Sequence, residues 1–419
     1  MRRVLRMCPI WGRAAWAATL GGVIMATSWS ATAAPRGYEF DRTMPRAVLE
    51  SYLSRAITMM DLLTGRGDVD DNIRMLTNIG VKFAGRTLYL WGGEGHLQRK
   101  LAAALTIAPK VHAADPEIIL QAAIFEIVTT QVEQIPVPDW VFREFGIEPE
   151  ERHFDYEAML NPSGRFVNHW SEGASVPDMT QTETRMWFYY LAAEYLDAGC
   201  EAIHFGQVAL IGAADEGHRH WWDMLSRVRR YARQHARRHF ILCDAHTPSG
   251  GPRCDGDKLL FDFHSFPLRI EEVPDRPHEG VLKMGYLDSI YGRSNGGVTP
   301  SGWRCDHLPY LVELDNFEAT GKGGQNIGAH WCWGWDEMSW FAHQPEAYRN
   351  QWLRYAWGWV REHDPNGHLQ MPGSRCLSDP PTDEDGHRIG WYHANPTSHA
   401  VPDGFNQEDT IRAIWAQDR

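Results

Sequence analysis

The 419-residue sequence lacks several patterns that mark particular classes of protein. Its seven cysteines include no Cys-x-x-Cys pair, which argues against a structural zinc site. Beyond the N-terminal segment there is no run of about 18 uncharged apolar residues, so we expect no membrane-spanning helix. Proline- and serine-rich linkers, low-complexity tracts and internal repeats are also missing, which favours one folded domain. Among the cysteines, Cys254 and Cys305 lie in glycine-rich loops and form the pair best suited to a disulfide.

Basic residues are few relative to acidic ones. The chain has 41 Lys and Arg against 54 Asp and Glu, a formal net charge of −13. An acidic surface disfavours nucleic acid and anionic membranes as partners. The arginine-rich stretch 227–238 is an exception, but Trp221, Leu225, Val228 and Ala232 fall on one helical face beside it. We therefore expect these arginines on the solvated side of a surface helix.

An N-terminal segment has the pattern of a secretory signal. Four arginines precede the apolar stretch from Ala14 to Met25, and Ala31-Thr-Ala33 supplies a cleavage site of small residues. The alternative, a membrane anchor, fits poorly because the apolar stretch is short and a cleavage site follows it. We therefore expect residues 1–34 to be removed on export to the periplasm or outside the cell, leaving residues 35–419 as the folded domain. The remaining 37 basic and 54 acidic residues would give a net charge of about −17.

Short apolar runs alternate along the chain with longer segments of helical periodicity. Eight strands are expected at about 86–91, 118–126, 165–170, 201–208, 239–245, 258–264, 310–315 and 327–335. Helices are expected within residues 45–79, around 97–107, in pieces of 139–160, from the capping box Thr180-Gln-Thr-Glu183 to about Leu196, across 221–238, and after Pro345.

Strands that alternate with helices in this number predict one particular α/β architecture. The fold expected is a single (β/α)8 (TIM) barrel with N-terminal lead-in helices and long loops after its strands. A doubly wound open sheet is the alternative. Such a sheet usually binds phosphate after its first strand, where Trp91-Gly-Gly-Glu-Gly95 would instead repel it through Glu94.

Carboxylate and histidine side chains close several of the expected strands. Side chains in a strand alternate between faces, so residues two apart share one face. The pairs of this kind are Asp244 with His246, Asp262 with His264, and Glu313 with Asp315, while Glu94 and Glu126 close two earlier strands. An acid that ends an apolar strand is costly unless water reaches it. Because the carboxyl ends of barrel strands meet at one face, the sequence predicts a single acidic site there.

Tryptophan is abundant, with 19 in the chain. Trp331, Trp333 and Trp335 alternate along the last expected strand, and Trp91 ends the first. Flat indole faces offer a sugar ring an apolar platform, while acids and amides hydrogen-bond its hydroxyls. The alternative is that indoles belong to the core, which we expect for the tryptophans of the predicted helices.

In these strand-end acids and tryptophans the chain resembles the secreted (β/α)8 glycoside hydrolases, over nearly all of residues 35–419, although no motif identifies one family. In the largest clan of those enzymes, an Asn-Glu pair ends strand four and a glutamate ends strand seven. Strand seven here offers Glu313 or Asp315, which fits the resemblance. Strand four ends in Gln207, which is neither acid nor base, so the proton donor would have to be Asp244, Asp262 or Glu126.

Together these features predict an exported enzyme that cleaves glycosidic bonds in an oligo- or polysaccharide without a metal or other cofactor. An acid such as Asp244 or Asp262, its pKa raised by neighbouring like charges, would protonate the leaving oxygen. Glu313 or Asp315 would attack the anomeric carbon or activate water. The residues expected to bind substrate are Trp91, Glu94, Gln207, His246, His264, Trp333, Trp335 and Asp336.

Two alternative functions stay open at this point. The Asp-x-His pairs that end strands five and six could bind a divalent metal in a metal-dependent barrel hydrolase. The replacement of the usual acid by Gln207 also allows a barrel that binds glycans without cleaving them.

Overall fold

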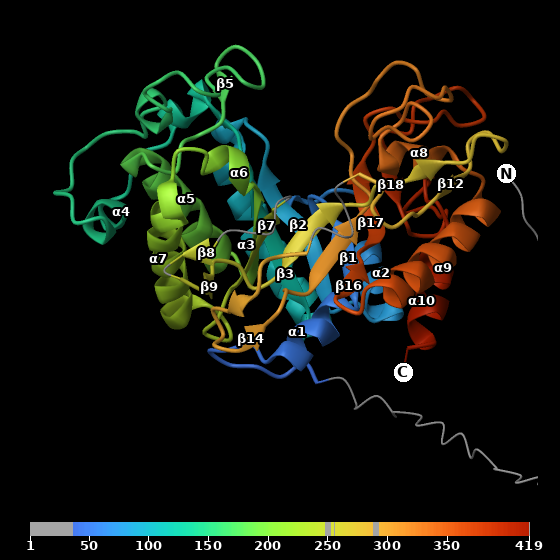
Figure 1. Ribbon diagram of the computed structural model, residues 1–419, viewed down its shortest axis with the longest axis horizontal. Helices are drawn as coiled ribbons and strands as arrows, with labels where there is room; N and C mark the ends of the chain where they lie inside the picture. Colours follow the sequence, from blue (N-terminus) through green and yellow to red (C-terminus); the bar gives the residue numbers. More distant parts are fainter. Residues whose placement is uncertain (1–36, 248–252, 255, 288–292, 419) are drawn as a thin grey trace, which may run out of the picture. The chain divides into compact units, whose positions relative to one another are not determined.

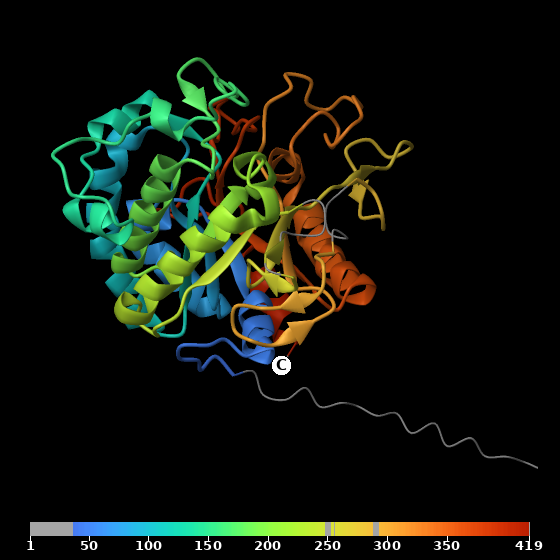
Figure 2. The same cartoon turned by 60° about the vertical axis from the view of Figure 1, so that its left-hand side comes forward.

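The computed structural model describes residues 37–247, 253, 254, 256–287 and 293–418, so the expected signal segment, residues 1–34, lies outside the described residues. Two sheets of mainly parallel strands lie at the centre of the described structure, and helices pack around them (Figure 1). Helices α5 and α7 lie on one side of the strands and helix α9 on the other, which the turned view also shows (Figure 2).

The larger sheet has seven strands in the order β18-β17-β1-β2-β3-β6-β7, and only the β17–β18 pair is antiparallel. Its strands are β1 (Ala56–Met59), β2 (Phe83–Leu90), β3 (Ile119–Ile124), β6 (Ala202–Gln207), β7 (Leu242–His246), β17 (Met371–Cys376) and β18 (Trp391–His393). The second sheet is parallel and consists of β10 (His264–Pro267), β15 (Tyr310–Glu313) and β16 (Gly367–Leu369).

Smaller sheets and the helices complete the described chain. The short strands are β4 (Val128–Thr129), β5 (Ala174–Ser175), β8 (Arg253–Cys254), β9 (Lys258–Leu259), β11 (Glu271–Glu272), β12 (Gly280–Val281), β13 (Gly297–Val298) and β14 (Arg304–Cys305). The α-helices are α1 (Arg46–Leu53), α2 (Val69–Ile79), α3 (Leu97–Ala114), α4 (Asp139–Glu144), α5 (Thr182–Asp197), α6 (Val208–Ile211), α7 (Arg219–His235), α8 (Glu337–His343), α9 (Glu346–His363) and α10 (Glu408–Ala416). Short 3-10 helices are η1 (Leu62–Thr64), η2 (Glu94–His96), η3 (Thr130–Gln134), η4 (Glu157–Met159) and η5 (Glu216–His218).

Single backbone hydrogen bonds link the two large sheets at both edges. Beside β7, the N–H of Asp262 donates to the carbonyl of Cys243 at 2.9 Å. At the other edge Gln370, the residue between β16 and β17, donates to the carbonyl of Val312 on β15 at 2.9 Å. The fold is therefore mixed α/β with parallel strands, as expected, but a closed (β/α)8 barrel is not shown, because the described strands pair as two separate ladders.

An apolar cluster closes the amino-terminal ends of the strands. Helix α1 contributes Tyr52 and Leu53 to it, and both are fully buried. The strands contribute Ala56, Phe83, Ile119, Ala202, Leu242 and Leu311. The cluster therefore draws on both large sheets, and the polar side chains described below lie further along the same strands.

Five expected strands are confirmed as β2, β3, β6, β7 and β15. Two are wrong, because residues 165–170 form turns and residues 327–335 hold only an isolated bridge between Cys332 and Trp335. The expected strand at 258–264 is reduced to β9 and the first residue of β10. Strands β1, β16 and β17 were not expected; the first is only four residues long and sits between two helices.

The predictions made from helical periodicity agree with the structure better than the predicted capping box does. Helix α7 buries the four apolar residues predicted for it, and α9 begins directly after Pro345. The capping box is wrong, because α5 begins after Gln181 without a side-chain cap. Glu183 instead accepts a hydrogen bond from Arg152 at 2.7 Å, so tertiary pairing has replaced the local cap.

Two expectations from composition can be compared with the described residues. No helix among them combines the length and apolarity needed to cross a membrane. Cys305 is a buried free thiol, whereas the side chain of Cys254 lies outside the described residues.

Candidate active site

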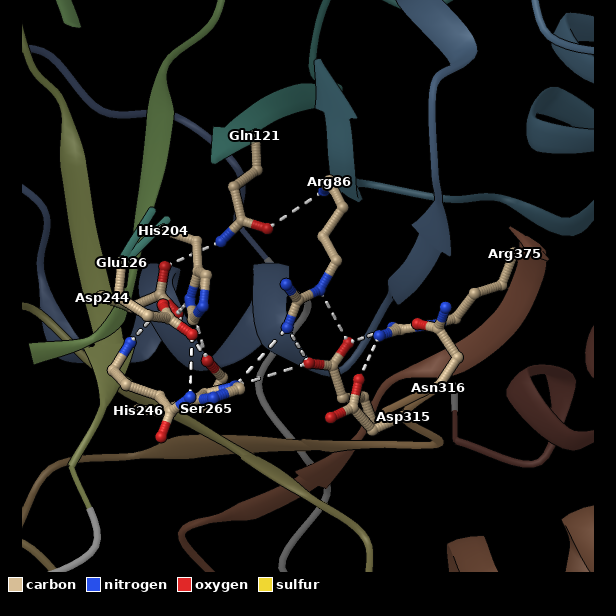
Figure 3. Close-up of polar contacts among 12 residues, drawn as sticks. Arg86, Gln121, Glu126, His204, Asp244, His246, Ser265, Asp315, Asn316 and Arg375 are labelled. Carbon is tan, nitrogen blue, oxygen red and sulfur yellow. Dashed lines mark hydrogen bonds and ion pairs between the residues drawn. The ribbon is translucent and has the colours of Figure 1, made fainter. Parts of the chain in front are cut away.

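Polar side chains from most of the central strands converge beyond the apolar cluster (Figure 3). They come from β2, β3, β6, β7, β10, β15 and β17 and from the residues that follow β3 and β15. The members, which we call the central cluster, are Arg86, Gln121, Glu126, His204, Gln207, Asp244, His246, Ser265, Glu313, Asp315, Asn316 and Arg375.

Asp244 lies at the buried end of the cluster. It is fully buried and accepts hydrogen bonds from Gln121 Nε2 and Ser265 Oγ, each at 2.7 Å. Its Oδ2 is 2.8 Å from Nδ1 of His204. Burial raises the pKa of Asp244 to about 7, with its hydrogen bonds and the nearby Arg86 opposing the rise. Burial also keeps the pKa of His204 well below its usual range, so this ring is neutral beside a carboxyl group that holds its proton near neutrality.

Glu313, at the end of β15, is held between two arginines. Arg86 binds both of its carboxylate oxygens, with Nε donating at 3.1 Å to Oε2, and Arg375 donates at 2.8 Å to the same oxygen. Nε2 of His246 lies 3.6 Å away. Burial alone would raise the pKa of Glu313, but Arg86 and Arg375 outweigh it and hold the pKa well below the usual range.

Asp315 is the more accessible carboxylate on this side of the cluster. Its side chain is 19% exposed against 1% for Glu313. Arg375 pairs with Asp315 and also donates from Nε to Asn316 at 2.7 Å. This guanidinium lowers the pKa of Asp315 against the opposing effect of burial, so the group is ionised.

Glu126 follows β3 and is fixed against the end of β6. The backbone N–H and the side-chain amide of Gln207 each donate to its carboxylate at 2.8 Å. Gly206 makes room for it, since a Cβ at that position would lie 2.0 Å from a Glu126 oxygen. Gly206 also has a φ of +52°, in the left-handed region that glycine tolerates. Gln207, which departs from the clan pattern, thus orients a carboxylate from the neighbouring strand.

Aromatic side chains border Glu126 on the solvent side. Trp91 is 48% exposed and packs edge-on against Trp170 and Phe125, with ring centroids 5.1 and 5.4 Å apart. The indole N–H of Trp170 donates to the Glu126 carbonyl at 2.8 Å. Phe125 in turn lies 5.3 Å below the Arg86 guanidinium, so the rings connect the surface to the central cluster.

Asp262 and His264 lie outside this network. Asp262 accepts from the Cys243 N–H at 2.9 Å and lies 3.4 Å from Arg229 of helix α7, facing the helical layer. Burial raises its pKa. His264 contacts Thr247 at 2.7 Å, and burial lowers its pKa to about 3. The structure therefore brings one predicted Asp-x-His pair, Asp244 and His246, into the cluster and leaves the other beside it.

Four other residues expected to bind substrate are engaged elsewhere. Glu94 is buried and accepts the Thr129 N–H at 2.8 Å, with burial raising its pKa. Trp333 and Trp335 are each only 7% exposed, so they do not form the expected open platform. The Trp333 indole donates to the carbonyl of Glu279 at 2.8 Å, and Trp335 stacks on His343 at 4.5 Å.

Asp336 caps helix α8 by accepting the Ser339 N–H at 2.8 Å. Burial, with a smaller contribution from the charge of Asp315, raises the pKa of Asp336 to about 6. This residue therefore borders the cluster without hydrogen bonding to it, within the described part of the chain.

Several members of the cluster were not expected from the sequence. Arg86 and Arg375 are buried arginines on strands, and the strand that carries Arg375 was itself missed. His204 stands three residues before Gln207, within the predicted strand, so its place near the strand end could have marked it. Gln121, Ser265 and Asn316 carried no signal in the sequence beyond their residue types, and the same holds for Trp170 beside the cluster.

No protein-family model and no curated protein matches the chain. Among solved structures it is similar to a Bacillus halodurans protein provisionally identified as an alpha-N-acetylgalactosaminidase, at 12% identity and a TM-score of 0.27, over 48% of this chain and 47% of that one. It is also similar to the Nostoc punctiforme debranching enzyme soaked with acarbose, at 10% identity and a TM-score of 0.36, over 83% of this chain and 70% of that one. The chain thus spans about half the length of the first of these proteins. Both neighbours carry the names of carbohydrate-active enzymes, but a likeness at these TM-scores assigns neither an activity nor a substrate to this chain.

Proposed function

We propose that this chain is an exported glycoside hydrolase that cleaves glycosidic bonds with two carboxyl groups of the central cluster. The observation that carries the proposal is that Asp244 and Asp315 belong to one connected network while their pKa values move in opposite directions. Cleavage of a glycosidic bond needs one carboxyl group that holds a proton and one that is ionised. Surroundings that separate two such pKa values assign these roles.

Asp244 supplies the proton in this mechanism. With its pKa raised to about 7, it carries a proton at the pH where Asp315 does not. Because Asp244 is fully buried, its proton passes first to Nδ1 of His204, and Nε2 of His204, which has no hydrogen-bond partner among the described residues, releases the proton that reaches the leaving oxygen. His204 lies 2.8 Å from Asp244, and its ring centroid is 4.7 Å from that of the more exposed His246.

Asp315 attacks the anomeric carbon or activates the attacking water. It is preferred to Glu313 because Glu313 is almost completely buried and both of its carboxylate oxygens accept hydrogen bonds from Arg86. Glu313 acts instead by holding Arg86 and Arg375 in place, and Arg375 keeps Asp315 ionised. The separation of the donor and the attacking carboxylate would decide between retention and inversion.

The substrate ring rests on Trp91 and Trp170. Their location beside Glu126 and Gln207 combines an apolar face with hydrogen-bonding groups, the arrangement that a sugar requires. The proposed sugar platform thus lies directly after β2 and in the loop between η4 and β5, in place of Trp333 and Trp335.

We further propose that the strands form one (β/α)8 barrel. β1, β2, β3, β6, β7, β10, β15 and the nearly continuous β16–β17 segment give the required parallel order. The backbone hydrogen bonds at Asp262 and Gln370 join consecutive members of that order across the two ladders. The shared apolar cluster at the amino-terminal ends supports the same closure.

Metal-dependent hydrolysis has less support in the described side chains. Asp262 and His264, one of the two ligand pairs that it requires, are occupied by Arg229 and Thr247. Two guanidinium groups also stand within the central cluster, where they would repel a divalent cation. We therefore retain the paired-carboxylate mechanism.

Purified protein incubated with a panel of oligo- and polysaccharides, with products followed by mass spectrometry, tests the proposal. On any substrate that is cleaved, Asp315→Asn and Asp244→Asn should each lower kcat by about a hundredfold or more, because each removes one acid–base group. Asp262→Asn should keep most of the turnover per folded molecule, because Asp262 faces Arg229.

Full turnover by both Asp315→Asn and Asp244→Asn, with circular dichroism unchanged, would reject the assigned pair. Binding of oligosaccharides without product formation would favour the non-catalytic alternative.

A further inference from the structure

A hollow lies on the helical layer, away from the central cluster. It is bounded by α4, α5 and α7, which Figure 1 shows on one side of the strands, and has a volume of about 480 Å³. Its walls combine aromatic rings with acids, chiefly Trp140, Tyr189, Tyr231, Glu194 and Asp197. None of these residues takes part in the proposed hydrolytic mechanism.

Three aromatic rings of the hollow are arranged around one another. Trp140 and Tyr231 are nearly parallel, at an interplanar angle of 28° with centroids 6.2 Å apart. Tyr189 stands across both, at 66° to Trp140 and 89° to Tyr231, with centroids 5.7 and 6.1 Å away. His235 stacks on Tyr231 at 3.9 Å and fixes that ring. The three rings pack against one another and together line the hollow, and the π face of an aromatic ring attracts a cation.

The charged residues of the hollow also favour a positively charged ligand. Arg143, the one arginine that lines it, pairs with Asp139 at 2.8 Å, and Glu144 pairs with Arg227 at 3.1 Å. Glu194 forms no ion pair with any residue that the structure describes, and burial together with the charge of Asp197 raises its pKa.

Asp197, one turn away on α5, accepts the Tyr231 hydroxyl at 2.7 Å, and among the described residues its one ion-pair partner is His235, at 4.0 Å. After the local ion pairs are formed, two acids of the hollow are therefore left without a strong cationic partner.

We propose that this hollow binds an organic ammonium ion, with the cation against the Trp140, Tyr189 and Tyr231 rings and its charge balanced by Glu194 and Asp197. An ammonium group satisfies both features at once, because its charge is attracted by the π faces and by the carboxylates. A neutral sugar could rest on the rings and donate its hydroxyls to the two acids, but it would leave their negative charge unbalanced. The ammonium group could be that of a free amine or of an amino sugar, since the chemistry at the hollow is the same.

Isothermal titration of the full chain with choline and with its neutral isostere 3,3-dimethylbutan-1-ol isolates the charge. Choline should bind at least about tenfold more tightly than the neutral alcohol. The isosteric change Glu194→Gln and the ring deletion Trp140→Ala should each reduce choline binding several-fold. Glu384→Gln, which changes an exposed acid outside the hollow, should leave it as in the wild type.

Glucosamine and glucose form a second pair of probes that distinguishes the two sources. Tighter binding of glucosamine than of choline assigns the site to amino sugars, and the reverse order assigns it to free amines; both outcomes support ammonium recognition. Equal binding of choline and its neutral isostere overturns the proposal, as does the absence of saturable binding by every probe. Choline binding that Glu194→Gln leaves unchanged, with the variant folded, also overturns it.

Discussion

At the scale of single residues, the central cluster keeps carboxyl groups of the same chemistry in different protonation states. The pKa of Asp244 is raised to about 7 because the group is buried and the residues that contact its carboxyl group, Gln121, Ser265 and His204, are all neutral. Glu313 is equally buried, yet its pKa is held low because two guanidinium groups surround it. The difference therefore lies in the partners rather than in the depth of burial.

The pKa of Asp244 links its protonation to the stability of the fold. A folded pKa near 7, above the value of about 4 in an unfolded chain, means that the native state binds this proton more tightly. The resulting stabilisation is fully present below about pH 4 and is lost as the pH rises through about 7; it amounts to at most about 4 kcal/mol.

Denaturant unfolding of the wild type and Asp244→Asn between about pH 4 and 8 measures this contribution, because the asparagine does not titrate. The unfolding free energy of the wild type relative to the variant should fall across the interval. A difference that stays constant with pH would mean that Asp244 titrates as an ordinary exposed acid.

At the scale of elements, the end of β6 is shaped to receive a side chain from β3. Gly206 leaves space for the Glu126 carboxylate, and Gln207 donates two hydrogen bonds to it.

The alternation of apolar and polar residues predicted where β3 and β6 would lie, because period-two patterns and turn residues are local signals. It failed at 327–335, where Trp333 adopts a φ of +50° and the tryptophans pack into loops instead of alternating along a strand.

Gly206→Ala should disturb the site and not only the backbone. An alanine there meets the cost of a positive φ, about 1 kcal/mol in unfolding free energy, and its Cβ also displaces the Glu126 carboxylate. Gly217→Ala is the matched control, since φ is +67° and the nearest atom to an added Cβ is 3.9 Å away. Both variants should lose similar stability from the backbone, while Gly206→Ala alone should lose additional stability and most of its turnover. Equal unfolding free energies and equal turnover in the two variants would show that Glu126 does not need this position.

At the scale of the whole molecule, the site is assembled from residues that are distant in the sequence. Arg86 and Glu313 are 227 positions apart, and Arg375 reaches Glu313 from a strand 62 positions further on. The acids could be predicted because each ends a recognisable apolar strand. The buried arginines could not be predicted. A buried arginine is stable only beside a carboxylate that the fold brings to it, and no local sequence pattern indicates that contact.

The pH dependence of kcat/KM on a cleaved oligosaccharide tests the central claim, that Asp244 holds the proton while Asp315 is ionised, most directly. The profile should fall on the alkaline side with a midpoint near pH 7, where Asp244 loses its proton, and on the acidic side only below the usual carboxylate range, where Asp315 gains one. In Asp244→Asn the residual activity should lack the alkaline fall. An activity that is constant or rising through pH 7 to 8 in the wild type, or an alkaline fall that persists in the variant, would contradict the assignment.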